Sequence, residues 1–173
     1  MIRDDFKSVT VQDRLDMYKK FEADFPDGWF EKVPDRIIRL EDRDRNGVAD
    51  HRTLFSDHFK NPEDGIGFSL LADEDNTVYF TCIPAVWKLT DSNDDGVADS
   101  HEKVADGFGV RVSFIGHDLH GITRGPDGML YFSVGDRGYY ITDAEGEVQS
   151  GPGSGAIFRC EPDGSGLELY CDG

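Results

Sequence analysis

The 173-residue sequence has few cysteines, few basic residues and no long hydrophobic run. Three cysteines supply neither a zinc cluster nor a dense disulfide framework. The 18 Lys and Arg against 35 Asp and Glu give a formal charge of −17, which argues against nucleic acid or an anionic membrane as partner and favours cations. No stretch approaches the roughly 18 apolar residues of a transmembrane helix, and the start M-I-R-D-D-F-K lacks the apolar core of a signal peptide. We therefore expect neither a membrane segment nor a signal peptide in this chain.

Two of the cysteines flank a turn sequence. Cys160 and Cys171 lie on either side of E-P-D-G-S-G, so they could face each other across a hairpin. A bridge formed in an oxidising compartment and two free, half-buried thiols are both compatible with this spacing. The cysteines therefore do not identify the compartment.

Many acidic residues gather in two similar segments, D-R-D-R-N-G-V-A-D at 42–50 and D-S-N-D-D-G-V-A-D-S-H-E at 91–102. Side-chain oxygens at loop positions one, three, five and nine, a glycine at six and a backbone carbonyl at seven form the ligand pattern of a Ca²⁺ loop. The predicted ligands are Asp42, Asp44, Asn46, Val48 and Asp50 in the first loop, and Asp91, Asn93, Asp95, Val97, Asp99 and Glu102 in the second.

The two loops differ at position twelve, where a Ca²⁺ loop carries a bidentate carboxylate. The second loop has Glu102 there, whereas the first has Thr53. The first loop should therefore bind weakly, borrow a carboxylate from elsewhere, or stay empty.

A repeat extends beyond the loops. Setting Leu40 on Leu89 superposes the two acidic segments, and an offset of 52 residues sets L-A-D-E-D-N-T-V-Y-F-T on T-R-G-P-D-G-M-L-Y-F-S. Short runs rich in Val, Ile, Tyr and Phe between Asp-Gly and Asp-Asn clusters are typical of strands. We expect strands near 36–41, 77–82, 84–90 and 129–134, with the acidic loops joining neighbouring antiparallel strands. Helices on both sides of a loop would instead indicate an EF-hand.

A period of about 50 residues with four short strands predicts a β-propeller blade, with a generic meander or sandwich as the alternative. The predicted fold is all-β, a partial β-propeller of about two and a half blades with a short N-terminal helix over 11–25. Residues 1–28 would form the helical segment and 29–173 the incomplete propeller. Residues around 138–154 are expected to form an insertion loop, and Trp29 and Trp87 to lie between blades. Because a propeller hides its sheet edges by closing, we expect a fragment of a longer protein.

The segment H-D-L-H-G-I-T-R-G-P-D-G-M-L-Y-F-S-V-G-D-R-G at 117–138 resembles the central motif of soluble quinoprotein glucose and sorbosone dehydrogenases. The paired acidic hairpins and G-A-I-F-R-C-E-P-D-G-S-G-L-E are more similar to the propeller region of planctomycete-type membrane-bound dehydrogenases, which often carry cytochrome c modules. The likeness covers about 29–173. It implies a six-bladed whole protein that is periplasmic or extracellular.

In the quinoprotein family the motif histidine accepts the proton of a substrate hydroxyl while hydride passes to pyrroloquinoline quinone (PQQ). By resemblance His117 is that base and Asp136 the carboxylate that orients it, a pairing that is chemically sound for proton abstraction. Arg137 could reach a quinone carboxylate. Gly116 stands where the family motif has an acid, and the family's other quinone-binding residues should lie beyond Gly173.

Two function classes follow. The first is part of a quinoprotein-like dehydrogenase that oxidises a sugar or other polyol, with PQQ, haem c on another domain or a cytochrome c as electron acceptor. The second is a non-catalytic, calcium-stabilised propeller that binds glycan or protein, in which His117 is only hydrogen-bonded to a turn. A metal pair of His117 and His120 is disfavoured, since residues three apart on a strand face opposite sides.

Overall fold

The structure is a computed structural model that describes residues 1–29 and 34–173. Its elements are α1 (Ile2–Asp5), α2 (Val11–Lys20), a short 3₁₀ helix (Glu22–Asp24), β1 (Ile37–Glu41), β2 (His51–Ser56), β3 (Gly67–Ala72), β4 (Thr77–Cys82), β5 (Ala85–Thr90), β6 (Ser100–Asp106), β7 (Leu119–Arg124), β8 (Leu130–Val134), β9 (Tyr139–Thr142), β10 (Val148–Gly151), β11 (Ala156–Cys160) and β12 (Glu168–Asp172). No helix among the described residues is long and apolar enough to cross a membrane.

All strand pairs are antiparallel. One four-stranded sheet has the order β3-β4-β5-β6 and another the order β12-β11-β8-β7, while β1-β2 and β9-β10 form two-stranded sheets. The fold is thus all-β and resembles part of a propeller, with two four-stranded blades and half of a third. Each strand prediction is confirmed, and both acidic loops join neighbouring strands, which rules out an EF-hand.

The two central strands of the β3–β6 sheet, β4 and β5, are buried on both faces, and most of their residues are buried. On one face Phe80 and Trp87 pack with Ile37 and Phe55 of the β1–β2 hairpin. On the other face Val86 belongs to the core shared with the β7–β12 segment. Full burial of such side chains contributes about 1.5–3 kcal/mol each, so successive blades are held together mainly by this packing.

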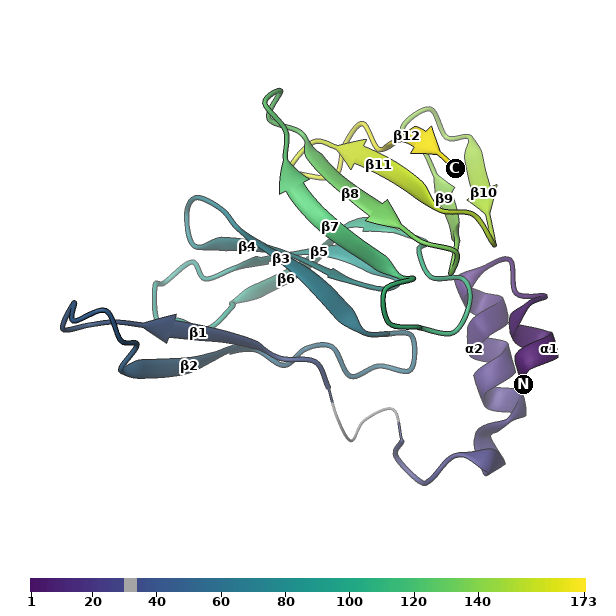
Figure 1. Cartoon of the computed structure of the whole chain (residues 1–173), viewed down its shortest axis with the longest axis horizontal. Helices are drawn as coiled ribbons and strands as arrows, with labels where there is room; N and C mark the ends of the chain where they lie inside the picture. The colour runs from purple at the N-terminus through teal and green to yellow at the C-terminus, as the bar shows by residue number, and fades with distance from the viewer. Residues whose placement is uncertain (30–33) are drawn as a thin grey trace.

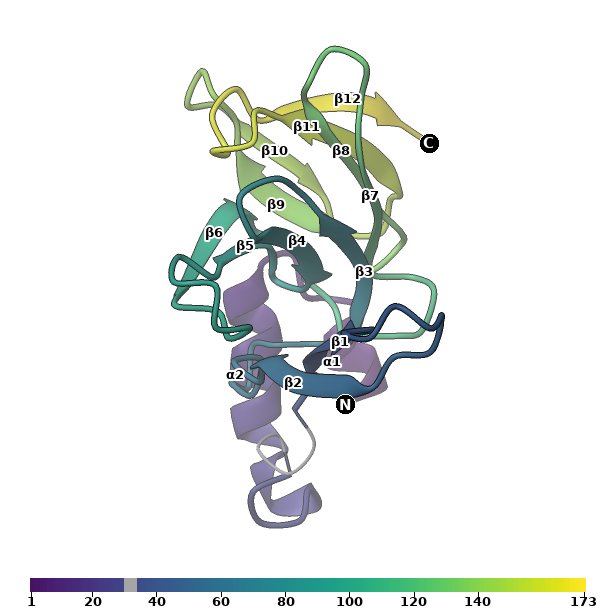
Figure 2. The same cartoon turned by 90° about the vertical axis from the view of Figure 1, so that its left-hand side faces the viewer.

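The inner strands of the two blades lie side by side. The backbone N of Gly121 in β7 donates to Oγ of Ser69 in β3 at 2.8 Å. From this pair the two sheets lead away in different directions (Figure 2). Since strand direction alternates, the β1–β2 and β5–β6 loops lie at one end of the sheets, whereas the helices lie at the opposite end (Figure 1).

The expected N-terminal helix is present, but it is shorter than predicted. It begins with a capping box, in which Thr10 Oγ1 accepts from Asp13 N at 3.1 Å and Asp13 Oδ2 accepts from Thr10 N at 2.9 Å. It ends at Lys20 and is followed by the 3₁₀ helix. The expected domain boundary at 28/29 adjoins residues 30–33, which lie outside the described residues.

Two details correct the sequence-based expectations, and a third decides between the two alternatives for the cysteines. The insertion around 138–154 forms the β9–β10 hairpin, because its Tyr- and Val-containing runs flank a D-A-E-G-E turn. Trp29 is 54 % exposed, although Trp87 is buried as expected. Cys160 is fully buried opposite Leu130, whereas Cys171 is exposed opposite Ile157, so both thiols are free and no disulfide joins them.

Candidate active site and cation-binding loops

The predicted acid–base pair, His117 and Asp136, lies at the same end of the sheets as the helices. Leu119 of β7 pairs with Val134 of β8, and the chain extends by two residues beyond this pair to His117 on one side and Asp136 on the other. Nδ1 of His117 lies 2.7 Å from Oδ1 of Asp136. The two side chains are about half exposed, at 45 % and 47 %. The structure therefore places the two groups within hydrogen-bonding distance and leaves the imidazole accessible to solvent.

Gly135 permits this approach. A Cβ atom at Gly135 would lie 2.6 Å from O and 2.9 Å from Cα of His117. Both are backbone atoms, so a side chain could be accommodated only by separating the two segments. The glycine of the G-D-R-G motif thus lets the histidine segment lie directly against the Asp136 segment.

Arg137 holds the carboxylate that orients the histidine. Its Nε lies 3.3 Å from Oδ1 of Asp136 and its Nη2 lies 3.1 Å from Oδ2. Its remaining terminal nitrogen, Nη1, lies 3.6 Å from Oδ2 of Asp5 in α1. The Arg137 guanidinium keeps the pKa of Asp136 below its ordinary value, His117 adds to this effect, and partial burial opposes it. Arg137 is therefore engaged by two carboxylates, a role different from the expected contact with a quinone.

A second acid, Asp118, follows the histidine and is fully buried. Its Oδ2 accepts hydrogen bonds from Ser113 Oγ and, at 3.0 Å, from Phe114 N. Its Oδ1 has no partner within 1–29 and 34–173. Burial raises the pKa of Asp118 to about 6, against the opposing effects of these hydrogen bonds and of the positive charge on Arg14. Asp118 is thus a carboxyl group that changes charge near neutral pH directly beside the candidate base.

Asp118 should make stability fall as pH rises. Its folded-state pKa of about 6 exceeds the ordinary value of 3.8, so the folded state retains a proton that the unfolded state has lost between these values. Stability from this group is fully present below about pH 4 and lost as pH approaches 6. We expect Asp118→Asn, which does not titrate, to gain roughly 3 kcal/mol relative to wild type between pH 4 and pH 7. Urea unfolding at several pH values measures this difference, and parallel profiles for the two proteins would contradict it.

The two acidic loops have the same backbone conformation. Position four is left-handed in both, with φ of 60° at Arg45 and 59° at Asp94. Position six is also in the positive-φ region, with φ of 92° at Gly47 and 89° at Gly96, which explains the glycine. The sequence repeat therefore corresponds to a repeat of detailed loop geometry.

Side-chain oxygens in each loop cap the backbone N–H groups of that loop. Asp42 accepts from Gly47 N at 2.7 Å, and its counterpart Asp91 accepts from Gly96 N at 2.8 Å. Position nine folds back onto position two in both loops, through Asp50 to Arg43 N at 3.1 Å and through Asp99 to Ser92 N at 2.7 Å. The pKa values of Asp42 and Asp99 are lowered, mainly by hydrogen bonds from Gly47 and Ser92 respectively.

The position-twelve residues lie on strands beyond the loops. Glu102 is exposed in β6 opposite Lys88, and Thr53 lies in β2 opposite Arg39. Thr53 instead lies beside the second loop: a Cβ atom added to Gly96 would lie only 3.3 Å from Cγ2 of Thr53. The hydrogen bond from position two to position nine closes each loop, and the residue at position twelve takes no part in it.

The second loop also joins two blades. Ala98 N donates to Phe55 O of β2 at 2.9 Å. Arg39 of β1 places Nη1 3.4 Å from Oδ2 of the buried Asp91 and 3.6 Å from Oδ1 of Asp94. The positively charged guanidinium of Arg39 thus contacts Asp91, the first predicted ligand of this loop.

The donor chemistry of both loops suits a hard cation, because all predicted ligands are oxygens. No group of three or more His, Cys, Asp or Glu side chains in the described part of the chain is arranged to hold a metal. The carboxylates nevertheless retain acceptor capacity, since each can accept about four hydrogen bonds or metal contacts and uses only part of this on the backbone. Each loop therefore already has the turn of a cation-binding loop, but its ligand oxygens would have to move closer together to bind a cation.

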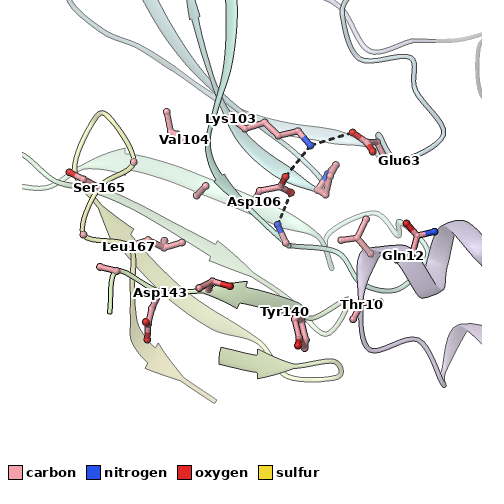
Figure 3. Close-up of a pocket in the computed structure, with 18 residues that line it drawn as sticks. Thr10, Gln12, Glu63, Lys103, Val104, Asp106, Tyr140, Asp143, Ser165 and Leu167 are labelled. Atoms are coloured by element: carbon pink, nitrogen blue, oxygen red, sulfur yellow. Dashed lines mark hydrogen bonds and ion pairs between the residues drawn. The ribbon is translucent and has the colours of Figure 1, made fainter. Parts of the chain in front are cut away.

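One groove is separate from these sites. It has a volume of about 870 Å³ and runs between β6, β9, the β11–β12 turn and the first turn of α2 (Figure 3). Lys103 is the one cation among its described lining residues, and it binds Glu63 at 3.3 Å and Asp106 at 3.0 Å. None of the predicted site residues lines this groove.

Comparison with known proteins identifies a family. Residues 13–173 match the model of a family described as "Domain of unknown function (DUF7133)". The chain belongs to this family. The match covers both blades, the two acidic loops and the His117–Asp136 pair, but it does not include α1 or Asp5. Neither the curated proteins nor the solved structures gave a match.

Proposed function

We propose that the chain supplies the proton-accepting part of a quinoprotein-like dehydrogenase that oxidises a sugar or other polyol. The observation that carries this proposal is the 2.7 Å contact between His117 Nδ1 and Asp136 Oδ1. A carboxylate beside Nδ1 favours the neutral tautomer that keeps its proton there, so that Nε2 is the acceptor. No residue within 1–29 and 34–173 forms a hydrogen bond with Nε2, and the ring is half exposed. A substrate hydroxyl can therefore approach it.

Oxidation of an alcohol to a carbonyl compound removes the hydroxyl proton and a hydride from the adjacent carbon. In this proposal His117 takes the proton on Nε2, and Asp136 stabilises the resulting imidazolium. Arg137 keeps Asp136 ionised and in place. The positive charge that the imidazolium gains would also favour the alkoxide that develops on the substrate.

The described residues do not fit a site for PQQ. Arg137, the expected contact for a quinone carboxylate, already binds Asp136 and Asp5. The hydride acceptor PQQ, and the haem c on another domain or the cytochrome c partner that would take its electrons one at a time, would then be held by other parts of the whole protein. We propose a six-bladed propeller of the periplasm or extracellular space as that whole protein, on the basis of the sequence resemblance.

The test is substrate-dependent reduction of a redox dye by the whole protein, supplied with PQQ and Ca²⁺ and screened against aldoses and polyols. We expect dye reduction with at least one such substrate. Absence of reduction with every substrate, together with stabilisation by Ca²⁺, would favour the alternative of a non-catalytic propeller that binds glycan or protein.

We further propose that the loops bind Ca²⁺, the second more tightly than the first. In the second loop Asp91, Asn93, Asp95 and Asp99 with the Val97 carbonyl would supply ligands, and Glu102 could add a further carboxylate. The first loop offers Asp42, Asp44, Asn46, Asp50 and the Val48 carbonyl. Supporting this proposal are the glycine turn at position six and the return of position nine in both loops.

Calorimetric titration with Ca²⁺ checks the second loop. Asp95→Ala removes a central ligand and is expected to weaken binding at least about tenfold, and Glu102→Gln should weaken it less, because affinity follows the number of charged ligands. Arg39→Gln should strengthen binding, since it removes the cation beside Asp91. Unchanged titrations for Asp95→Ala and Arg39→Gln would mean that this segment is only an Asp-rich turn.

A further inference from the structure

The N-terminal helix α1 lies against the candidate active site. Asp5, its last residue, is 8 % exposed. Oδ1 of Asp5 accepts a hydrogen bond from Val112 N at 2.6 Å, and Oδ2 lies 3.6 Å from Nη1 of Arg137. The next residue, Phe6, packs its ring under the guanidinium of Arg111 at 5.4 Å. Helix α1 is therefore attached to the segment between β6 and β7 that leads to His117.

Arg137 connects Asp5 to the acid–base pair. Its backbone is fixed on two sides, since Arg137 N donates to His117 O at 3.3 Å and its carbonyl accepts from Arg111 N at 3.1 Å. Its side chain is only 14 % exposed and extends between Asp5 and Asp136. A planar guanidinium that contacts carboxylates along two edges has a fixed orientation. Asp136 is 47 % exposed, and its side chain contacts His117 and Arg137.

Removal of Asp5 would change this arrangement in a defined way. Nη1 of Arg137 would lose its partner in a largely buried position, which is unfavourable. The guanidinium charge would then act on Asp136 and His117 without the compensating charge of Asp5. The surroundings of the imidazole would become more positive by one charge, which disfavours its protonated form.

We propose that Asp5 is a positioning residue of the active site, which acts on His117 through Arg137 and Asp136 without touching substrate. This inference rests on the proposed function for its catalytic consequence, but the structural link to His117 can be tested without it. Asp5 precedes the residues matched by the family model, so the first helix adds to the site a part that the family match does not cover.

NMR of the His117 ring tests the link. Asp5→Asn keeps an acceptor for Val112 N and removes the charge. Asp4→Asn is a matched control, because Asp4 is on the same helix as Asp5 but pairs with Lys20 of α2 at 2.5 Å. We expect Asp5→Asn to shift the ring resonances of His117 at a fixed pH, and Asp4→Asn to leave them unchanged. Arg137→Lys, which loses the contact along two edges, should raise exchange or disorder of the Asp136 resonances. Identical His117 ring resonances in wild type, Asp5→Asn and Asp4→Asn would overturn the proposal.

Activity measurements separate this inference from the proposed function. In the whole protein, Asp5→Asn should lower kcat roughly tenfold with KM unchanged. An NMR shift in a protein whose His117→Gln variant is fully active would retain Asp5 as a positioning residue and remove the dehydrogenase assignment. If His117→Gln is inactive but Asp5→Asn has the same NMR spectrum and the same kcat as Asp4→Asn, the dehydrogenase assignment is retained and Asp5 is not a positioning residue.

Discussion

Replacing His117 by Gln is expected to lower turnover of the sugar or polyol by roughly 10²- to 10⁴-fold, the usual contribution of one general base. The glutamine amide can still donate a hydrogen bond to Asp136, but it cannot take the substrate proton at neutral pH. Because the histidine side chain is half exposed, folding and Ca²⁺ affinity should change little. Dye-linked steady-state kinetics of the whole protein give kcat, and circular dichroism with Ca²⁺ calorimetry verifies that the variant is intact.

Two further variants show whether the loss of turnover in His117→Gln is specific to the base. Asp136→Asn should cost less than His117→Gln, since it removes the group that orients the ring and leaves the base itself. His120→Gln is a matched histidine control, because His120 lies three residues later in β7 with Nδ1 bonded to Asp118 O at 2.7 Å and does not contact Asp136. A His117→Gln protein that oxidises its substrate at the wild-type rate would eliminate the catalytic assignment.

The sequence predicted the blade architecture well because the signals were local and repeated. Turn chemistry at the acidic loops recurs with a fixed offset, and short runs rich in Val, Ile, Tyr and Phe between the turns, such as those of β4 and β5, indicate strands. The family resemblance named His117 and Asp136, and the G-P-D-G turn accounts for their contact, since it joins β7 and β8, whose outer ends lead to these two residues.

Long-range contacts explain what the sequence did not predict. Asp5 reaches Val112, more than 100 residues later, and no local pattern marks it as part of the site. Asp118 was part of the recognised motif, yet its burial depends on Ser113 and on the helix that carries Arg14. Trp29 was assigned to the core by residue type alone, and its exposure depends on where the segment after α2 runs.

The core between the two blades is expected to depend on Phe158 more than on any neighbouring residue of β11. Phe158 is fully buried, and its ring lies 5.2 Å from Phe108, 6.0 Å from Phe132 and 4.9 Å from Tyr139. These partners come from the segment after β6, from β8 and from the inserted hairpin. Phe158→Ala should therefore lower the free energy of unfolding by roughly 3–5 kcal/mol, the usual range for a buried Phe.

The adjacent Ile157 provides the control. It lies on the other face of β11 and is 40 % exposed, so Ile157→Ala should cost about 1 kcal/mol or less. Urea unfolding can be followed by circular dichroism for all sheets and by tryptophan fluorescence, to which Trp87 contributes from the other blade. Since Phe158 belongs to the core shared by both blades, its replacement should shift the two signals together. A shift in circular dichroism alone would mean that the blades unfold independently, and that the acid–base pair on one blade and the second acidic loop on the other are not linked through this core.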